Sequence, residues 1–210
     1  MSIAEMIDHT ILKPDATRKD VLARCQEARD YGFASVCINS CWVRTVAEAL
    51  EGSDVKTGCA VGFPLGAQTK EVKVFEAVDA IKNGANEIDM VVNIGAVKDQ
   101  DWNTVEEEIR EVVEHVRPVV VKVILETCLL TDAEKKKVCQ IAEKAGADFV
   151  KTSTGFSTGG ATVEDVKLMK QSCNLKVKAS GGIRTREFAE QLIKAGADRI
   201  GTSNGVALLP

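Results

Sequence analysis

The chain has little that would support chemistry based on metals, disulfides or membranes. It contains two histidines, His9 and His115, in neither an HxH nor an HxxxH spacing, so no transition-metal site is expected. Its seven cysteines are odd in number and include no CxxC pair, which favours reduced thiols in a cytoplasm over a secreted disulfide scaffold. No run reaches the ~18 uncharged apolar residues of a membrane span. The N-terminal MSIAEMIDHT carries acids where a signal peptide has basic residues.

The chain also has no net positive charge, and its aromatic residues are few. The net charge of −4 gives no support for a nucleic-acid or anionic-membrane partner. Aromatic residues make up 4% of the chain, so the core must consist mainly of Val, Ile, Leu and Ala. Hydrophobic residues at 45% and charged residues at 28% exclude disorder, collagen and coiled coil. A single domain over residues 1–210 is therefore expected.

What the chain does contain is a regular alternation of short apolar runs and amphipathic segments. Eight runs are expected to be strands, at 6–11, 33–38, 55–61, 87–92, 119–125, 149–152, 175–179 and 199–202. Seven segments between them have helical patterns, at 18–30, 42–50, 69–83, 102–115, 132–145, 163–171 and 185–195. Thr17, Thr131 and Thr162 each begin a Thr-x-x-acid sequence and are expected helix N-caps.

A repeated phrase supports a serial β/α fold. The form K-x-G-A-[ND]-x-[IV] occurs at 82–88, 144–150 and 194–200, with a weaker copy at 31–34, and predicts a helix that ends at glycine before a strand begins. Eight strands with intervening helices predict an α/β fold of the (β/α)8 TIM-barrel type, although about 250 residues is more typical. The rival is a doubly wound open sheet, but no GxGxxG follows the first expected strand.

Four expected strands carry ionisable residues where parallel strands are normally apolar. These are Asp89, Lys122, Lys151 and Lys178. Their sequence neighbours alternate with them and are apolar, so the charges are expected to point into the barrel. Asp89 and Lys151 come from alternate strands and should share one layer of the interior, with Lys122 and Lys178 in the next.

A buried cluster of three ammonium groups and one carboxylate is costly, and loss of a proton from at least one lysine would relieve it. A neutral lysine at a barrel mouth can attack a carbonyl to form a Schiff base, while a neighbouring ammonium and carboxylate transfer protons. The alternative is a purely structural role, since a single strand lysine is usually solvated at its tip. Lys122 is expected to bind the substrate, although it could simply be the structural partner of Asp89.

Glycine-rich segments follow the last three strands. Ser180-Gly181-Gly182-Ile183-Arg184 and Gly201-Thr202-Ser203-Asn204-Gly205 lie where barrels commonly bind phosphate, and 206–209 could form the short extra helix. Thr154–Gly160, which includes Gly155, would add N–H and hydroxyl groups to the same rim, and Gly62–Gly66 is expected to bound the pocket. The alternative is ordinary glycine turns before helices. Cys37 could face the mouth, although core packing is the more common role of cysteine. Asp8 and His9 are expected to be structural support.

Four motifs closely resemble the deoxyribose-phosphate aldolase family: DHTxLKP at 8–14, EIDMVxN at 87–93, VKTSTG at 150–155 and KASGGI at 178–183. The resemblance implies a class I aldolase that reversibly cleaves 2-deoxy-D-ribose 5-phosphate to D-glyceraldehyde 3-phosphate and acetaldehyde. It implies a Schiff base on Lys151 and proton relay by Asp89 and Lys178. It further implies phosphate binding around Gly181, Gly182 and Ser203, no cofactor or metal, a role in deoxyribose phosphate catabolism, and a homo-oligomer, either dimer or tetramer.

The chain departs from some members of that family at two points. Phe156 stands where those members have a lysine, and the only tyrosine is Tyr31 rather than one in a C-terminal tail. Turnover or the preference for a phosphorylated substrate is therefore expected to differ from theirs. Two other functions stay open from the residues alone: another class I barrel aldolase with a different donor, and a non-catalytic barrel that binds phosphosugars.

Overall fold

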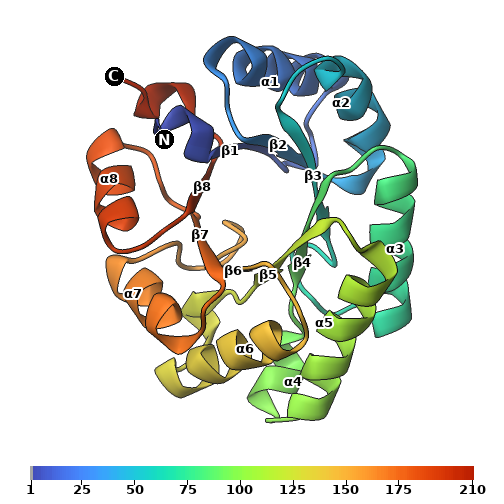
Figure 1. Cartoon of the computed structure of the whole chain (residues 1–210), viewed down its shortest axis with the longest axis vertical. Helices are drawn as coiled ribbons and strands as arrows, with labels where there is room; N and C mark the ends of the chain where they lie inside the picture. The colour runs from blue at the N-terminus through green and yellow to red at the C-terminus, as the bar shows by residue number, and fades with distance from the viewer. Residues whose placement is uncertain (1) are drawn as a thin grey trace.

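Eight parallel strands follow one another around a closed barrel, with β8 paired to β1 (Figure 1). The structure is a computed structural model and describes residues 2–210. The strands are β1 (Ile7–Ile11), β2 (Ser35–Ile38), β3 (Lys56–Val61), β4 (Glu87–Val91), β5 (Val120–Ile124), β6 (Phe149–Lys151), β7 (Lys176–Ser180) and β8 (Arg199–Thr202). All eight expected strands are present, and the prediction of a (β/α)8 barrel is confirmed.

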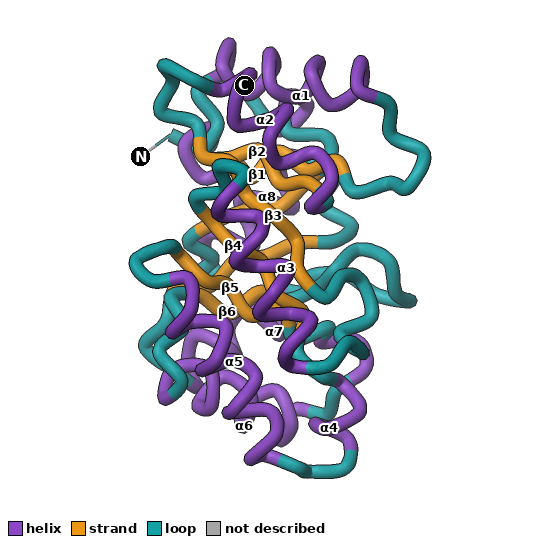
Figure 2. The backbone as a smooth tube through the Cα atoms, turned by 90° about the vertical axis from the view of Figure 1, so that its right-hand side faces the viewer, coloured by secondary structure: helices purple, strands orange, loops and turns teal. Residues whose placement is uncertain are grey.

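The helices form a ring outside the strands, as the side view in Figure 2 also shows. They are α1 (Arg18–Tyr31), α2 (Val43–Leu50), α3 (Lys70–Lys82), α4 (Ile94–Lys98), α5 (Trp102–Val116), α6 (Asp132–Lys144), α7 (Val163–Ser172) and α8 (Arg186–Lys194). The 3-10 helices are Ala4–Met6, Ser40–Trp42, Thr127–Leu129 and Val206–Leu208. None of the helices described between residues 2 and 210 is long and apolar enough to cross a membrane.

Local sequence signals set the helix boundaries. The side chains of Thr17 and Thr131 complete capping boxes with Asp20 and Glu134, and the side chain of Thr162 accepts from the backbone N–H of Asp165. All three expected N-caps are confirmed. The α4 helix was not expected, because five residues are too few for a periodic apolar pattern.

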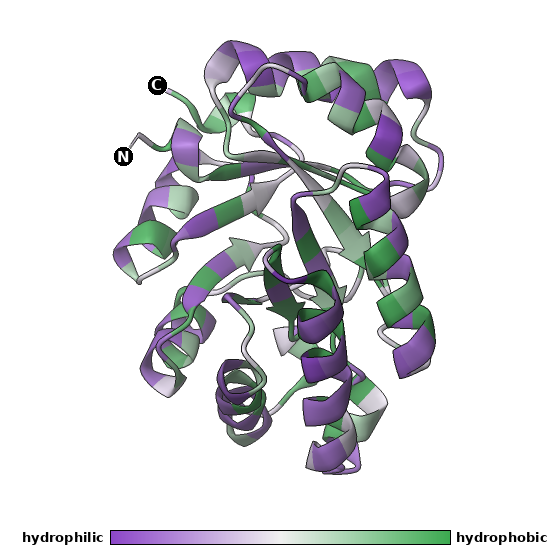
Figure 3. Cartoon of the chain, turned by 45° about the vertical axis from the view of Figure 1, so that its right-hand side comes forward, coloured by the Kyte–Doolittle hydropathy of each residue, from purple (hydrophilic) through white to green (hydrophobic). Residues whose placement is uncertain are grey.

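The aliphatic core lies between the strands and the helices. Strand residues such as Ile88, Val121, Val150 and Val177 are fully buried against the apolar faces of the helices. In Figure 3, hydrophilic and hydrophobic colours alternate along several strands, while hydrophilic colour is prominent on the outer helix surfaces. Because these side chains point outward, the alternate strand residues must fill the inside of the barrel.

A buried ion pair fastens α3 to α5 next to the end of β4. The Nζ atom of Lys73 lies 2.8 Å from Glu108 and 2.9 Å from the carbonyl oxygen of Val91, while Glu108 accepts from the backbone N–H of Asn93 at 2.5 Å. Burial lowers the pKa of Lys73 and raises that of Glu108. The pair thus holds the chain directly after the strand that carries Asp89.

We expect Lys73→Met to lower the free energy of unfolding by about 3–5 kcal/mol, because it leaves the Glu108 carboxylate buried without its counter-charge. Urea denaturation measures the change. The double variant Lys73→Met/Glu108→Leu should recover part of the loss. Lys70→Met is the matched control, since it breaks an exposed pair with Glu107 one turn earlier and should cost less than about 1 kcal/mol. Equal effects of Lys73→Met and Lys70→Met would contradict this account.

Candidate active site

Asp89 lies at the centre of a charged cluster inside the barrel. Its Oδ1 atom is 2.8 Å from Nζ of Lys122, and its Oδ2 atom is 2.9 Å from Nζ of Lys151 and 2.6 Å from Nζ of Lys178. All four side chains are at most 3% exposed. In the strand register, Asp89 lies beside Lys122, and Lys151 lies beside Lys178. The long side chains of Lys151 and Lys178 reach from their own pair to the carboxylate of Asp89.

A second set of charged residues surrounds this cluster. The sequence assigned only a structural role to Asp8, and it did not point to Glu87 or Arg199. Glu87 lies 2.5 Å from Nζ of Lys122, and Asp8 lies 2.5 Å from Nζ of Lys178. Arg199 donates to both of these carboxylates. The expected ratio of three ammonium groups to one carboxylate is therefore wrong, because the interior holds two further carboxylates together with a guanidinium.

These contacts determine how the groups titrate. Burial lowers the pKa of Lys122, but Asp89 and Glu87 more than offset it, so the pKa is raised. Burial acts in the same way on Lys178, and Asp8 and Asp89 again raise its pKa. Burial raises the pKa of Asp89, yet the three lysines hold it well below its usual range. Lys122 and Lys178 are thus held as cations.

Lys151 differs from the other two lysines in its surroundings. Among the described residues it has a single carboxylate partner, Asp89, whereas Lys122 and Lys178 each have two. It is also the last residue of β6, at the carboxyl end of the strands, where TIM-barrel enzymes place their active sites. An amine in this position, beside a carboxylate and a second ammonium, can add to a carbonyl and exchange protons.

The sequence left the roles of two residues open, Cys37 and Lys122, and the structure shows their surroundings. The Sγ atom of Cys37 lies 3.8 Å from Oδ2 of Asp89, so this buried thiol faces the cluster as well as filling space. Its pKa is raised by burial and by Asp89, which disfavours the thiolate. Lys122 has both carboxylate partners at its tip and is 1% exposed, so its ammonium group is fully paired within the cluster.

The glycine loops after β6, β7 and β8 lie together at the rim. Ala161 donates to the carbonyl oxygen of Gly181 at 3.0 Å, and the hydroxyl of Thr202 donates to the carbonyl oxygen of Ile183 at 2.8 Å. Three predicted residues, Gly155, Gly182 and Ser203, are exposed there, and Gly181 is half-buried. Gly155, Gly181 and Gly182 all have positive φ, a conformation that favours glycine.

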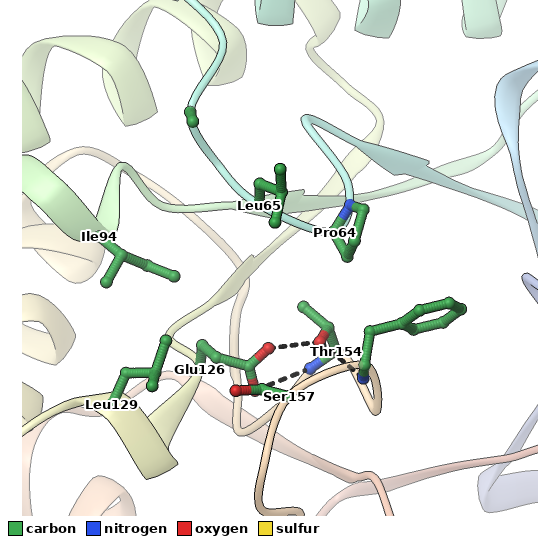
Figure 4. Close-up of a pocket in the computed structure, with 9 residues that line it drawn as sticks. Pro64, Leu65, Ile94, Glu126, Leu129, Thr154 and Ser157 are labelled. Atoms are coloured by element: carbon green, nitrogen blue, oxygen red, sulfur yellow. Dashed lines mark hydrogen bonds between the residues drawn. The ribbon is translucent and has the colours of Figure 1, made fainter.

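Beside this rim, a pocket of about 400 Å³ opens above β3–β6 (Figure 4). Its lining is largely apolar and includes Pro64 and Leu65, so the loop at 62–66 does bound a pocket as expected. Thr154 also lines it, but the N–H and hydroxyl of this residue both donate to Glu126. They are therefore not free for an anion, contrary to the expectation for this part of the loop.

Comparison with known proteins identifies the family. The model of the DeoC/LacD family aldolases matches residues 2–209. The chain belongs to this family. A deoxyribose-phosphate aldolase of Listeria monocytogenes serotype 4a (strain HCC23) is 60% identical over 212 residues, covering 100% of this chain and 95% of its relative. One of Geobacillus sp. (strain WCH70) is 58% identical over 211 residues, covering 99% and 95%.

Solved structures of the family have the same fold. The tetrameric deoxyribose phosphate aldolase from Aeropyrum pernix has a TM-score of 0.92 at 36% identity, covering 98% of this chain and 88% of that one. The DeoC/LacD assignment confirms the expected resemblance and the class of enzyme, an aldolase and hence a lyase. Among residues 2–210, no group of three or more His, Cys, Asp or Glu residues could hold a metal ion.

The sequence held a signal for one of the missed residues of this aldolase. Glu87 is two positions before Asp89 in the same strand, and the period of two places both on the inner face. Asp8 and Arg199 were harder to find, because they meet only when β8 closes against β1.

The charged cluster predicts a specific pH dependence of stability. The lysines and Arg199 lower the pKa of Asp8 and Asp89 in the folded state despite burial. An unfolded aspartate takes up its proton near pH 3.9, so below that pH the unfolded chain binds more protons and the free energy of unfolding falls. We expect Asp8→Asn to reduce the slope below pH 4 by about 1.4 kcal/mol per pH unit.

Urea denaturation at a series of pH values between 2 and 6 measures this slope. The exposed Asp15→Asn variant serves as the control and should leave the slope unchanged. An Asp8→Asn variant with the wild-type slope would show that Asp8 does not titrate below the unfolded value.

Proposed function

We propose that the chain is a class I deoxyribose-phosphate aldolase, with residues 1–210 acting as one barrel domain. It reversibly cleaves 2-deoxy-D-ribose 5-phosphate to D-glyceraldehyde 3-phosphate and acetaldehyde through a Schiff base on Lys151. The observation that carries the proposal is the meeting of Lys151 and Lys178 at one carboxylate oxygen of Asp89, at 2.9 and 2.6 Å. The names of relatives at 58–60% identity support the choice of substrate.

The first half of the reaction builds the imine. As the neutral amine, the Nζ atom of Lys151 adds to the C1 aldehyde of the open-chain sugar, and Asp89 beside it relays the proton that the nitrogen then loses to the new hydroxyl oxygen. Asp89 and Lys178 then deliver protons to the carbinolamine oxygen, which leaves as water. The resulting iminium is the electron sink for the next step.

The second half breaks the C2–C3 bond. The electrons of that bond move into the iminium and form an enamine between C1 and C2, while the C3 hydroxyl loses its proton and becomes the aldehyde of glyceraldehyde 3-phosphate. Protonation of the enamine at C2 gives the imine of acetaldehyde. Water hydrolyses this imine and restores the amine of Lys151, so no atom is gained or lost by the enzyme.

The phosphate is proposed to bind to backbone N–H groups of the rim. Gly155, Gly181, Gly182 and Ser203 are supported by their exposure on loops that lie together at the carboxyl end of the barrel. A cytoplasmic location and a role in deoxyribose phosphate catabolism also belong to this proposal. They rest on the cysteine usage and on the family.

We expect sodium borohydride with acetaldehyde to leave a reduced adduct on Lys151, detected by mass spectrometry of peptides. The reason is that borohydride reduces an imine to a stable secondary amine at the attacking nitrogen. Lys151→Ala should abolish cleavage of deoxyribose phosphate. Lys178→Leu should slow it by about 10²–10⁴-fold, because proton transfer to the carbinolamine loses its donor.

The matched control is Lys176→Leu, which changes an exposed lysine on the same strand as Lys178 and should leave turnover unchanged. An adduct on another lysine of an active enzyme would sink the assignment of Lys151. An adduct formed with a different donor aldehyde, but not with acetaldehyde, would point to another class I aldolase.

We also propose that the aldolase self-associates as a dimer or tetramer. On α3, Phe75 is 74% exposed and Val72 is 50% exposed, and the Aeropyrum pernix relative is a tetramer. Light scattering after gel filtration should give two or four times the chain mass of 22.6 kDa. Phe75→Lys should shift the mass toward the monomer, and Tyr31→Lys on α1 should not. A wild-type mass of one chain at all concentrations would refute self-association.

A further inference from the structure

One buried carboxylate at the barrel mouth has no part in the reaction described above. Glu126 lies two residues after the end of β5. It is 2% exposed although it borders the pocket of Figure 4. Its backbone is left-handed, with φ 57° and ψ 64°. Within residues 2–210, Gln100 is the one other non-glycine residue with a positive φ. A strained backbone that presents a buried acid indicates that the position of this side chain matters.

The carboxylate of Glu126 holds the loop after β6. Its Oε1 atom accepts from the backbone N–H of Thr154 at 3.3 Å, and its Oε2 atom accepts from the hydroxyl of Thr154. The hydroxyl oxygen of Thr154 accepts in turn from the backbone N–H of Phe156 at 3.0 Å. One carboxylate therefore holds the turn from 154 to 156 through Thr154. Dashed lines mark the hydrogen bonds between Glu126 and Thr154 in Figure 4.

This turn begins three residues after Lys151, and the chain between them is held from both neighbouring strands. On the β5 side, Leu125 and Thr127 donate to the carbonyl oxygens of Lys151 and Thr152, each at 2.9 Å. Glu126 is the residue between these two donors. On the β7 side, the hydroxyl of Ser180 donates to the carbonyl oxygen of Ser153 at 2.6 Å.

From these contacts we infer that Glu126 is a positioning residue for Lys151. Its carboxylate fixes Thr154, and Thr154 fixes the path by which the chain leaves the three-residue strand β6, so that Nζ of Lys151 stays directed at Asp89. The inference rests on the proposed function, since it concerns the rate at which Lys151 forms its imine.

The test compares imine formation in Glu126→Ala, Glu126→Gln and Thr154→Val. Rapid-quench borohydride trapping with acetaldehyde gives the rate at Lys151, and steady-state cleavage of deoxyribose phosphate gives kcat and KM. We expect Glu126→Ala and Thr154→Val to slow trapping and kcat by about ten- to a hundredfold, the cost of a misplaced reacting group. Glu126→Gln should recover most of this rate, because its amide can still bond both groups of Thr154, accepting from the backbone N–H through its oxygen and donating to the hydroxyl oxygen through its NH2.

The matched control is Glu143→Ala. Glu143 also accepts two hydrogen bonds, one from the backbone N–H of Asn174 at 3.1 Å and one from its side-chain amide at 2.9 Å. Asn174 precedes β7, so this contact lies at the end of the barrel opposite to Lys151. We expect this variant to trap acetaldehyde at the wild-type rate. Circular dichroism and thermal melting establish that each variant is folded. Glu126→Gly, which suits the positive φ, replaces Glu126→Ala if that variant does not fold.

Three results would overturn the inference. The first is trapping at the wild-type rate in folded Glu126→Ala or Glu126→Gly and in Thr154→Val. The second is a Glu126→Gln variant as slow as Glu126→Ala. The third is a Glu143→Ala variant slowed to the same degree as Glu126→Ala. Absence of an adduct on wild-type Lys151 refutes the proposed function, and the inference with it. That result is distinct, because it is obtained before any variant of Glu126 is compared.

Discussion

The contact of one carboxylate, Asp89, with three ammonium groups is the interaction on which the rest of the structure depends. The interior of a TIM barrel is normally filled by layers of branched aliphatic side chains. Here the same space holds charges that are almost completely shielded from water. Buried charges of this kind are tolerated only when each has a partner, because an unpaired one costs several kcal/mol. The outer residues Asp8, Glu87 and Arg199 are therefore as necessary to the barrel as the central four.

The pairing also separates the lysines by role. Two of them are fixed by two carboxylates each, which keeps them positively charged and in place. Lys151 shares only Asp89, and it lies at the end of its strand. The proposed role of Lys151 as the nucleophile thus rests on an uneven distribution of carboxylates among three otherwise similar side chains.

Much of this could be predicted from the sequence, for physical reasons that apply to particular residues. The repeated K-x-G-A corner revealed the barrel because each copy ends a helix and starts a strand within a few residues. Asp89 and the lysines stood out because charge is rare in buried parallel strands. Arg199 and Asp8 did not, since they lie 191 positions apart and their contact exists only in the closed barrel. The hydrogen bonds between Glu126 and Thr154 could not be predicted either, because they depend on a left-handed backbone at a non-glycine residue.

The glycines of the rim connect the two ends of the proposed site. A Cβ atom at Gly160 would lie 2.2 Å from the carbonyl oxygen of Gly181, so the loops after β6 and β7 can approach this closely only with glycine at that crossing. Ala161 then donates to the same oxygen at 3.0 Å. Because the β6 loop follows Lys151 and the β7 loop carries the proposed phosphate N–H groups, they form one connected unit. The distance between the amine and the rim is consequently set by backbone contacts, which do not vary with the rotamers of exposed side chains. On the proposed function, such a fixed spacing is the property that would let the barrel select a phosphorylated sugar by its length.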